Sequence, residues 1–78
     1  MDRQAVALSV IAEVVGRTPE EIQAEQDLVA DLEIDSPKAL QLLVTLEEKL
    51  EIEISDEDAA RLEKVQDVLD FVNEPKPN

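Results

Sequence analysis

The stretch DLEIDSPKAL holds the residues of this chain whose types and spacing could support chemistry. Its carboxylates Asp31, Glu33 and Asp35 alternate like the first ligands of a calcium loop, and the hydroxyl of Ser36 follows them directly. A calcium loop needs glycine at its sixth position and glutamate at its twelfth, but the sequence has Ser36 and Leu42 there. We therefore expect no metal site and interpret the carboxylates as a solvated acidic loop.

Ser36 lacks the neighbours that would make it a catalytic nucleophile. A serine nucleophile needs an adjacent base and a group that orients that base, and the chain contains no histidine and no cysteine. Lys38 is a poor base, because it keeps its proton near pH 7 and points around the helix away from Ser36. We predict that the protein is not an enzyme, since general-base catalysis near neutral pH would need a shifted carboxylate or lysine.

Two interpretations of Ser36 are left open by the residue types. A serine before proline at a helix start is usually an N-cap, worth about 1 kcal/mol, with Pro37 then at the first helical position. Alternatively, Ser36 carries a covalent group. It ends a long loop, and a helix N-terminus favours a phosphate through its free N–H groups and its dipole.

Composition limits the classes of protein that the chain can belong to. Twenty Asp and Glu against seven Lys and Arg give a formal charge of -13, which disfavours nucleic acids and anionic membranes and favours basic protein partners. Hydrophobic residues make up 44% of the 78 residues, enough for the packed core of one small domain. The sequence lacks an apolar run long enough to cross a membrane and a signal-peptide pattern. We expect a cytoplasmic monomer with one folded domain at 1–73 and a flexible tail at 74–78.

The apolar spacing predicts an all-α fold. A first helix carries one buried stripe from Ala7 to Val15 and stops at Gly16. A long connection follows, in which Thr18 is expected to open a capping box and Ile22 and Leu28 to reach the core.

The second half of the chain supplies three further predicted elements. The helix at 37–50 has an apolar arc of about 200°, wider than a surface helix needs, and is expected to be the central one. Residues 50–54 are expected to form an extended connector that buries Ile52 and Ile54. A short helix at 55–62 and a last helix at 62–72 complete a bundle of three main helices and a short one.

The sequence resembles the acyl carrier protein family around Asp35 and Ser36. The family has an Asp-Ser pair at the start of its second helix, and the segments LEEKLEIEIS and VQDVLDFV are also similar to it. The resemblance extends over 18–72 and includes the N-terminal helix. It implies a four-helix bundle of acyl-carrier type with a long loop between its first two helices.

The resemblance also implies a function and a site. The serine matching Ser36 carries 4'-phosphopantetheine, which a phosphopantetheinyl transferase takes from coenzyme A, and the arm's thiol holds acyl groups as thioesters. The implied partners are that transferase and acyl-transfer enzymes with basic docking patches, which fit the strong acidity. The expected partner-binding residues are Asp35, Pro37, Glu47 and Glu48.

The sequence departs from the family pattern at three places. Pro37 follows the serine where leucine is usual, Glu33 replaces a usual glycine and restricts the backbone there, and Lys38 and Gln41 replace commonly acidic residues. These departures predict a specialised carrier of fatty-acid, polyketide or related biosynthesis.

Cargo and function have alternatives that the sequence does not exclude. The apolar arc of the 37–50 helix, facing Ala7, Ala59 and Ala60, could open a slot for an acyl chain or could be plain core packing. The alternatives for function are an aminoacyl or peptidyl carrier, and an unmodified carrier-like protein-interaction module.

Overall fold

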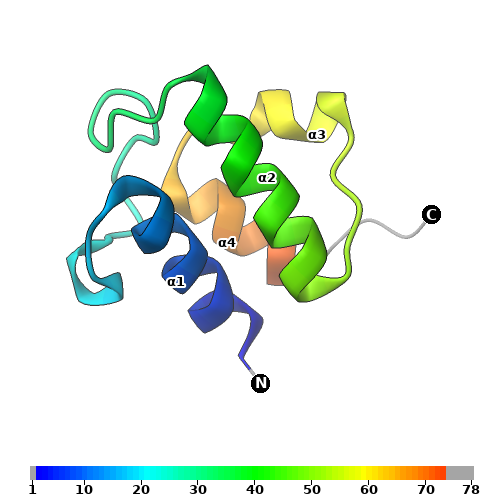
Figure 1. The fold of residues 1–78 in the computed structure, drawn as a ribbon, viewed down its shortest axis with the longest axis horizontal. Helices are drawn as coiled ribbons and strands as arrows, with labels where there is room; N and C mark the ends of the chain where they lie inside the picture. The colour runs from blue at the N-terminus through cyan, green and yellow to red at the C-terminus, as the bar shows by residue number, and fades with distance from the viewer. Residues whose placement is uncertain (1, 74–78) are drawn as a thin grey trace.

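This computed structural model describes residues 2–73, which contain four α-helices and one short 3₁₀ helix (Figure 1). The α-helices are α1 (Arg3–Val15), α2 (Ser36–Leu50), α3 (Asp56–Arg61) and α4 (Val65–Asn73), and the 3₁₀ helix is η1 (Pro19–Glu21). Since α3 has just six residues, the predicted bundle of three main helices and a short one is confirmed. The predicted tail at 74–78 lies outside the described residues, so the boundary at 73 stays a prediction.

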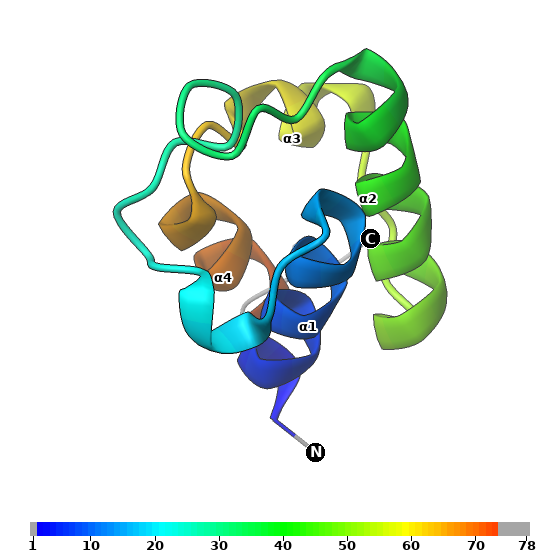
Figure 2. The same cartoon turned by 60° about the vertical axis from the view of Figure 1, so that its left-hand side comes forward.

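The central helix is α1, which packs against both α2 and α4 and lies between them in Figure 2. The prediction that the 37–50 helix is central was therefore wrong. Of the apolar arc of α2, Leu42 and Leu46 are buried, but Leu40 is 64% exposed and Val44 is 42% exposed. The buried residues of α1 supply the centre of the core instead: Ala7, Val10, Ile11 and Ala12.

Gly16 ends α1 in the manner that the sequence predicts. Its φ of 73° lies in the left-handed region that glycine adopts without steric cost. The N–H of Gly16 donates to the carbonyl of Glu13 at 3.3 Å, and the N–H of Arg17 donates to that of Ala12 at 2.8 Å. These two bonds form a Schellman motif, which satisfies carbonyls that the end of a helix leaves free.

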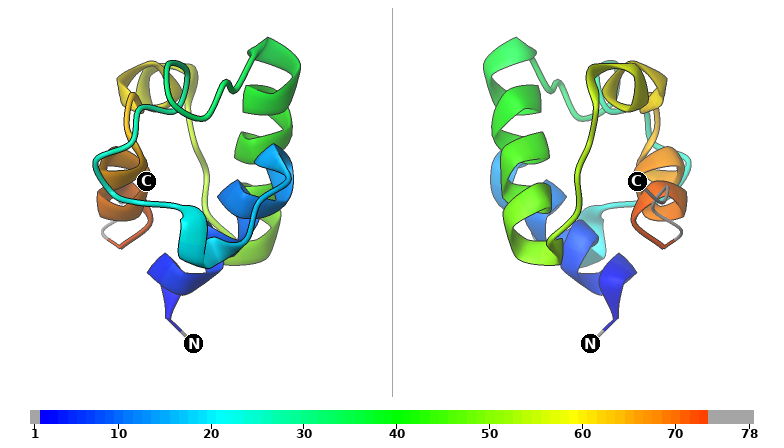
Figure 3. Two further views of the ribbon diagram at one scale, coloured as in Figure 1. Left: turned by 90° about the vertical axis from the view of Figure 1, so that its left-hand side faces the viewer. Right: turned by 90° about the vertical axis from the view of Figure 1, so that its right-hand side faces the viewer.

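The long loop between α1 and α2 is anchored to the core rather than loose. It passes beside α3 and α4 on its way to α2 (Figure 3), and its four aliphatic anchors are buried: Ile22, Leu28, Leu32 and Ile34. The N–H of Leu28 donates to Glu63 at 2.9 Å, and the N–H of Val65 donates to Gln26 at 3.0 Å. The backbone pairing of the loop with the α3–α4 link thus fixes the approach to α2.

Two local predictions about caps and connectors need correction. Thr18 makes no capping bond to the backbone of η1; its hydroxyl instead donates to the Glu21 carboxylate at 3.1 Å. Ile52 and Ile54 are half-buried rather than buried, and the predicted connector at 50–54 overlaps the end of α2, because Leu50 is helical and Glu51 ends the helix with a left-handed φ of 53°. The Ser55 hydroxyl does accept from the N–H of Asp58 at 3.1 Å, which confirms the predicted start of α3.

Candidate functional site

Ser36 is the first residue of α2, and Asp35 caps that helix. The side chain of Asp35 accepts a hydrogen bond of 3.0 Å from the backbone N–H of Lys38, and the extended backbone of Asp35 is that of an N-cap. The expectation that Ser36 caps the helix, with Pro37 at the first helical position, was therefore wrong by one residue. Aspartate and serine are comparable caps, so the sequence left their order open, and the capping role leaves the Ser36 hydroxyl without a structural task.

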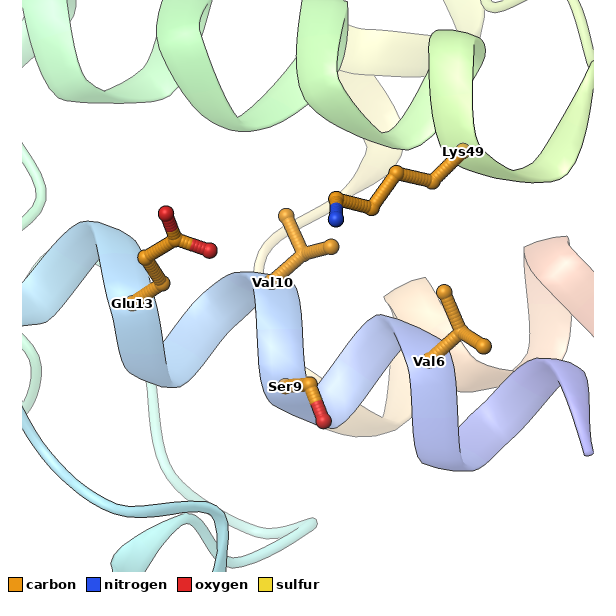
Figure 4. Close-up of a pocket in the computed structure, with 5 residues that line it drawn as sticks. All are labelled: Val6, Ser9, Val10, Glu13 and Lys49. Carbon is orange, nitrogen blue, oxygen red and sulfur yellow. The ribbon is translucent and has the colours of Figure 1, made fainter.

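The hydroxyl of Ser36 is available for chemistry. Ser36 is exposed, and the structure gives its side chain no hydrogen-bond partner among the described residues. The hydroxyls of Thr18 and Ser55 already make local hydrogen bonds. Ser9 is also exposed, but it lies in the middle of α1, and Figure 4 shows its hydroxyl pointing away from α2. Ser36 thus combines an open hydroxyl with the start of a 15-residue helix.

The other predicted site residues fall into two groups along α2. Asp35 and Pro37 are exposed beside Ser36, whereas Glu47 and Glu48 lie about 17 Å further along the helix, at 1.5 Å per residue. Glu48 is exposed. Glu47 is half-buried, and its carboxylate accepts a hydrogen bond of 3.0 Å from the N–H of Ile54. Glu47 therefore ties the connector to α2 in addition to any contact with a partner.

The exposed pair Leu40 and Val44 was missed as a functional feature by the sequence reasoning. The two residues are one turn apart and continue the line that starts at Ser36, at spacings of four and eight residues. The width of the apolar arc was the available signal. An arc of about 200° exceeds what one core face can bury, so its edge had to face solvent.

A small apolar cavity lies under the first half of α2. Its volume is about 80 Å³, and its lining comes from the long loop, α2 and the end of α3: Leu28, Val29, Ile34, Ala39, Leu42, Leu43 and Leu62. The slot that we expected against Ala7, Ala59 and Ala60 is not this cavity, because none of those three lines it. Ala7 is fully buried in the core, and Ala60 is exposed.

A larger groove between α1 and α2 lacks comparable chemistry. It has a volume of about 350 Å³ and is lined by Val6, Ser9, Val10, Glu13 and Lys49 (Figure 4). In the figure, Lys49 extends from α2 toward α1 above Val10. The groove is open to solvent and lies near the end of α2 opposite Ser36, so it is not the candidate site.

The acidic loop before Ser36 is ordered by its own carboxylates. The backbone N–H groups of Ala30 and Val29, each 2.9 Å from Asp27 Oδ1, lower the pKa of Asp27 from 3.8, and the charge of Lys64 lowers it further. The Asp31 carboxylate accepts from the N–H of Asp27 at 2.6 Å. Among the described residues no group of acidic side chains is arranged to hold a metal ion. The carboxylates therefore stabilise turns.

Comparisons with known proteins place this arrangement in a family. Residues 6–72 match the family model described as "Phosphopantetheine attachment site". The chain belongs to the acyl carrier protein family. An acyl carrier protein from Thermosynechococcus vestitus is 40% identical over 65 residues, which cover 83% of this chain and 80% of that protein. An acyl carrier protein from Chlamydia trachomatis is 36% identical over 66 residues, which cover 85% of this chain and 86% of that protein.

A solved structure agrees with this assignment. A Mycobacterium tuberculosis protein provisionally assigned as an acyl carrier protein superposes with a TM-score of 0.83 at 35% identity, covering 91% of this chain and 95% of its own. The predicted family, the carrier-type helical fold and the non-enzymatic carrier function are thereby confirmed. The prosthetic group is 4'-phosphopantetheine. The described helices include none that is long and apolar enough to span a membrane.

The residues at the start of α2 fit such a prosthetic group. The group needs an unhindered hydroxyl on an exposed element and an environment that tolerates a phosphodiester. Ser36 supplies the first, and the N-terminal turn of a 15-residue helix supplies the second through its dipole. The negative charge of Asp35 offsets part of this effect.

Proposed function

We propose that Ser36 is the attachment residue for the 4'-phosphopantetheine arm of this acyl carrier protein. The observation that carries the proposal is the position of Ser36: an exposed hydroxyl, without a hydrogen-bond partner in the described chain, at the first residue of α2. The Ser36 hydroxyl is not used for capping, because Asp35 caps α2.

The division of labour between the carrier and its enzymes supports the proposal. This chain has no histidine or cysteine to deprotonate Ser36, so the base must come from a phosphopantetheinyl transferase. In that enzyme's site the Ser36 oxygen would form a phosphodiester bond with the phosphopantetheinyl group of coenzyme A, and the nucleotide part of coenzyme A would leave. When attached, the arm supplies the thiol that holds acyl groups. The chain's own role is to present and steer it.

The surface around Ser36 is proposed to bind partner enzymes. Asp35 and Pro37 flank the attachment residue, and Glu47 and Glu48 lie at the far end of the same helix. Together with the net charge of -13, these carboxylates support docking to enzymes whose basic groups face the two ends of α2. A flexible arm also raises the effective concentration of the cargo in the docked enzyme to about the mM range.

Fatty-acid, polyketide or related biosynthesis is the proposed pathway class. The apolar cavity beneath α2 supports acyl cargo over aminoacyl or peptidyl cargo, because none of its lining side chains is polar. The cytoplasmic location and the monomeric state remain predictions.

The experiment that tests the proposal is enzymatic loading followed by intact-protein mass spectrometry. The chain is incubated with coenzyme A, magnesium and a broad-specificity phosphopantetheinyl transferase. We expect one phosphopantetheinyl increment, which Ser36→Ala abolishes and Ser9→Ala leaves in place. An unmodified wild-type chain, or an increment that survives Ser36→Ala, would refute the assignment and favour an interaction module.

A further inference from the structure

The outward face of α2 next to Ser36 is apolar. Leu40 is 64% exposed and Val44 is 42% exposed, and they are two of the three large hydrophobic side chains exposed in the described chain. Because residues four apart lie above one another on a helix, Ser36, Leu40 and Val44 form one line along α2. An enzyme that reaches Ser36 from outside must cover this line.

Charge is distributed very unevenly around this face. The chain carries a net charge of -13, and its acidic residues concentrate on both sides of α2 in the sequence. Residues 17–35 hold seven carboxylates and one arginine, and residues 51–58 hold five carboxylates and no basic residue. α2 itself has two lysines and two glutamates, so it is formally neutral. In its first eleven residues Lys38 is the single charged side chain.

Lys38 is placed to meet an enzyme that contacts Ser36. It is exposed, it lies in the same first turn of α2 as Ser36 but about 200° around the helix, on the other flank of the exposed face, and among the described residues its ammonium group makes no ion pair. At 100° per residue, Lys49 lies within about 20° of Lys38 around the axis of α2, and its side chain lines the groove between α1 and α2 (Figure 4). Lys49 is about 16 Å further from Ser36, at 1.5 Å per residue, which makes it a matched control for Lys38.

We infer that Lys38 selects the partners of this carrier. The fitting enzyme surface has an apolar centre that receives Leu40 and Val44, an acidic side chain opposite Lys38, and basic groups at the two ends of the helix. Enzymes whose docking surface is basic throughout are rejected, since a like charge would face Lys38. The inference rests on the proposed attachment at Ser36 and specifies the partner class of that site.

The physical basis is that apolar anchors supply affinity while charges decide which partners fit. Exposed side chains that become desolvated at the centre of an interface dominate binding energy. Like charges placed against each other in a contact cost several kcal/mol, whereas charges outside it act mainly through long-range steering. Lys38 therefore decides among partners that the acidity of the whole chain attracts equally.

The test uses an acyltransferase of fatty-acid synthesis whose docking surface is basic throughout. Chains loaded at Ser36, with the increment verified by mass, serve as acyl acceptors, and kcat/KM is measured. Lys38→Glu should raise kcat/KM about tenfold, whereas Lys49→Glu, which changes the net charge equally, should change it less than about twofold. Leu40→Ala should lower it about tenfold with either residue at position 38.

A reciprocal change in the enzyme completes the test. When the basic residue that faces Lys38 is replaced by glutamate, the wild-type carrier should become the better acceptor and Lys38→Glu the worse one. Equal effects of Lys38→Glu and Lys49→Glu would overturn the selection by Lys38, and an unchanged kcat/KM for Leu40→Ala would overturn the apolar centre.

A second arm separates this inference from the attachment proposal. Direct binding of unloaded Ser36→Ala chains to the same acyltransferase is measured with and without Lys38→Glu. If no chain is ever loaded but Lys38→Glu still tightens this binding, the attachment proposal fails and the docking inference stands. Loaded chains with no effect of Lys38→Glu in either arm would overturn the docking inference alone.

Discussion

The carboxylate of Asp35 accepts a hydrogen bond of 3.0 Å from the backbone N–H of Lys38, so the residue before Ser36 holds the first turn of α2 in place. This bond satisfies one of the N–H groups that a helix start leaves free. Asp35 thus has a structural role in capping, and in the proposed function its charge also contacts partner enzymes. The two roles can be separated, because capping needs an oxygen acceptor and steering needs a charge.

We expect Asp35→Asn and Asp35→Ala to differ in their free energy of unfolding but to show similar rates of loading by the transferase. Asparagine is as good a cap as aspartate, so Asp35→Asn should leave the free energy of unfolding within about 0.5 kcal/mol of wild type, while Asp35→Ala should lower it by about 1 kcal/mol. Both remove the charge beside Ser36, so both should slow loading by the transferase. Urea denaturation and loading rates measure the two effects. Normal loading of Asp35→Asn would assign Asp35 to capping alone.

Glu47 and Glu48 are adjacent but should respond differently to truncation. The Glu47 carboxylate accepts from the N–H of Ile54 at 3.0 Å and holds the connector against the end of α2, whereas Glu48 is exposed. Glu47→Ala should therefore lower the free energy of unfolding by about 1 kcal/mol, and Glu48→Ala should change it by less than about 0.5 kcal/mol. Urea denaturation of both variants checks this difference. Equal losses would show that the bond from Ile54 contributes nothing to stability.

The cavity beneath α2 should stabilise the loaded protein as its cargo grows. Each methylene that enters removes apolar surface from water and adds up to about 0.8 kcal/mol, so the melting temperature should rise with acyl length. With about 80 Å³ available, the rise should level off after the first few methylenes unless the helices move apart. Thermal unfolding of a series of acylated forms measures this. Ala39→Val narrows the cavity, so it should reduce the rise in melting temperature with acyl length. The same rise in Ala39→Val as in wild type would show that the acyl chain does not enter this cavity.

The parts of the fold that could be predicted from sequence are those fixed by local chemistry. Gly16 ends α1 because of its left-handed conformation, and Ser55 begins α3 because its hydroxyl reaches the N–H of Asp58. The central helix could not be predicted in the same way. Leu40 and Val44 are residue types that are usually buried, yet both are exposed. Whether an apolar arc packs against one neighbouring helix or two depends on the tertiary arrangement.

The candidate site was predictable in its location but not in its details. The segment around Ser36 was identified, whereas the cap fell on Asp35, since both residue types cap equally well. The cavity could not be located, because it is lined by the long loop as much as by helices, and the path of a 20-residue connection is set by bonds such as that of Leu28 to Glu63.

Glu33 adopts a left-handed backbone conformation, with φ of 55°, two residues before the cap of α2. A side chain permits this conformation at a cost, which is about 1 kcal/mol for a residue with a Cβ. Glu33→Gly should therefore raise the free energy of unfolding by about 1 kcal/mol in urea denaturation. Glu33→Ala removes the same charge but keeps the Cβ, so it isolates the contribution of repulsion. Equal stabilisation by both variants would assign the gain to charge.

Asp27 should give the stability of the protein a pH dependence at acidic pH. Hydrogen bonds from Ala30 and Val29, together with the charge of Lys64, lower the pKa of Asp27 below 3.8 in the folded chain. A group with a lowered pKa stabilises the fold fully above its unfolded value, and this contribution is lost as the pH falls through the folded value. Asp27→Asn should therefore be less stable than wild type at pH 7, and the difference should shrink below about pH 4. Urea denaturation between pH 2.5 and 7 measures this difference in the free energy of unfolding. Glu25→Gln is the control for removing one carboxylate of the loop. A difference that stays constant over this range would show that the folded environment does not act through the ionised form of Asp27.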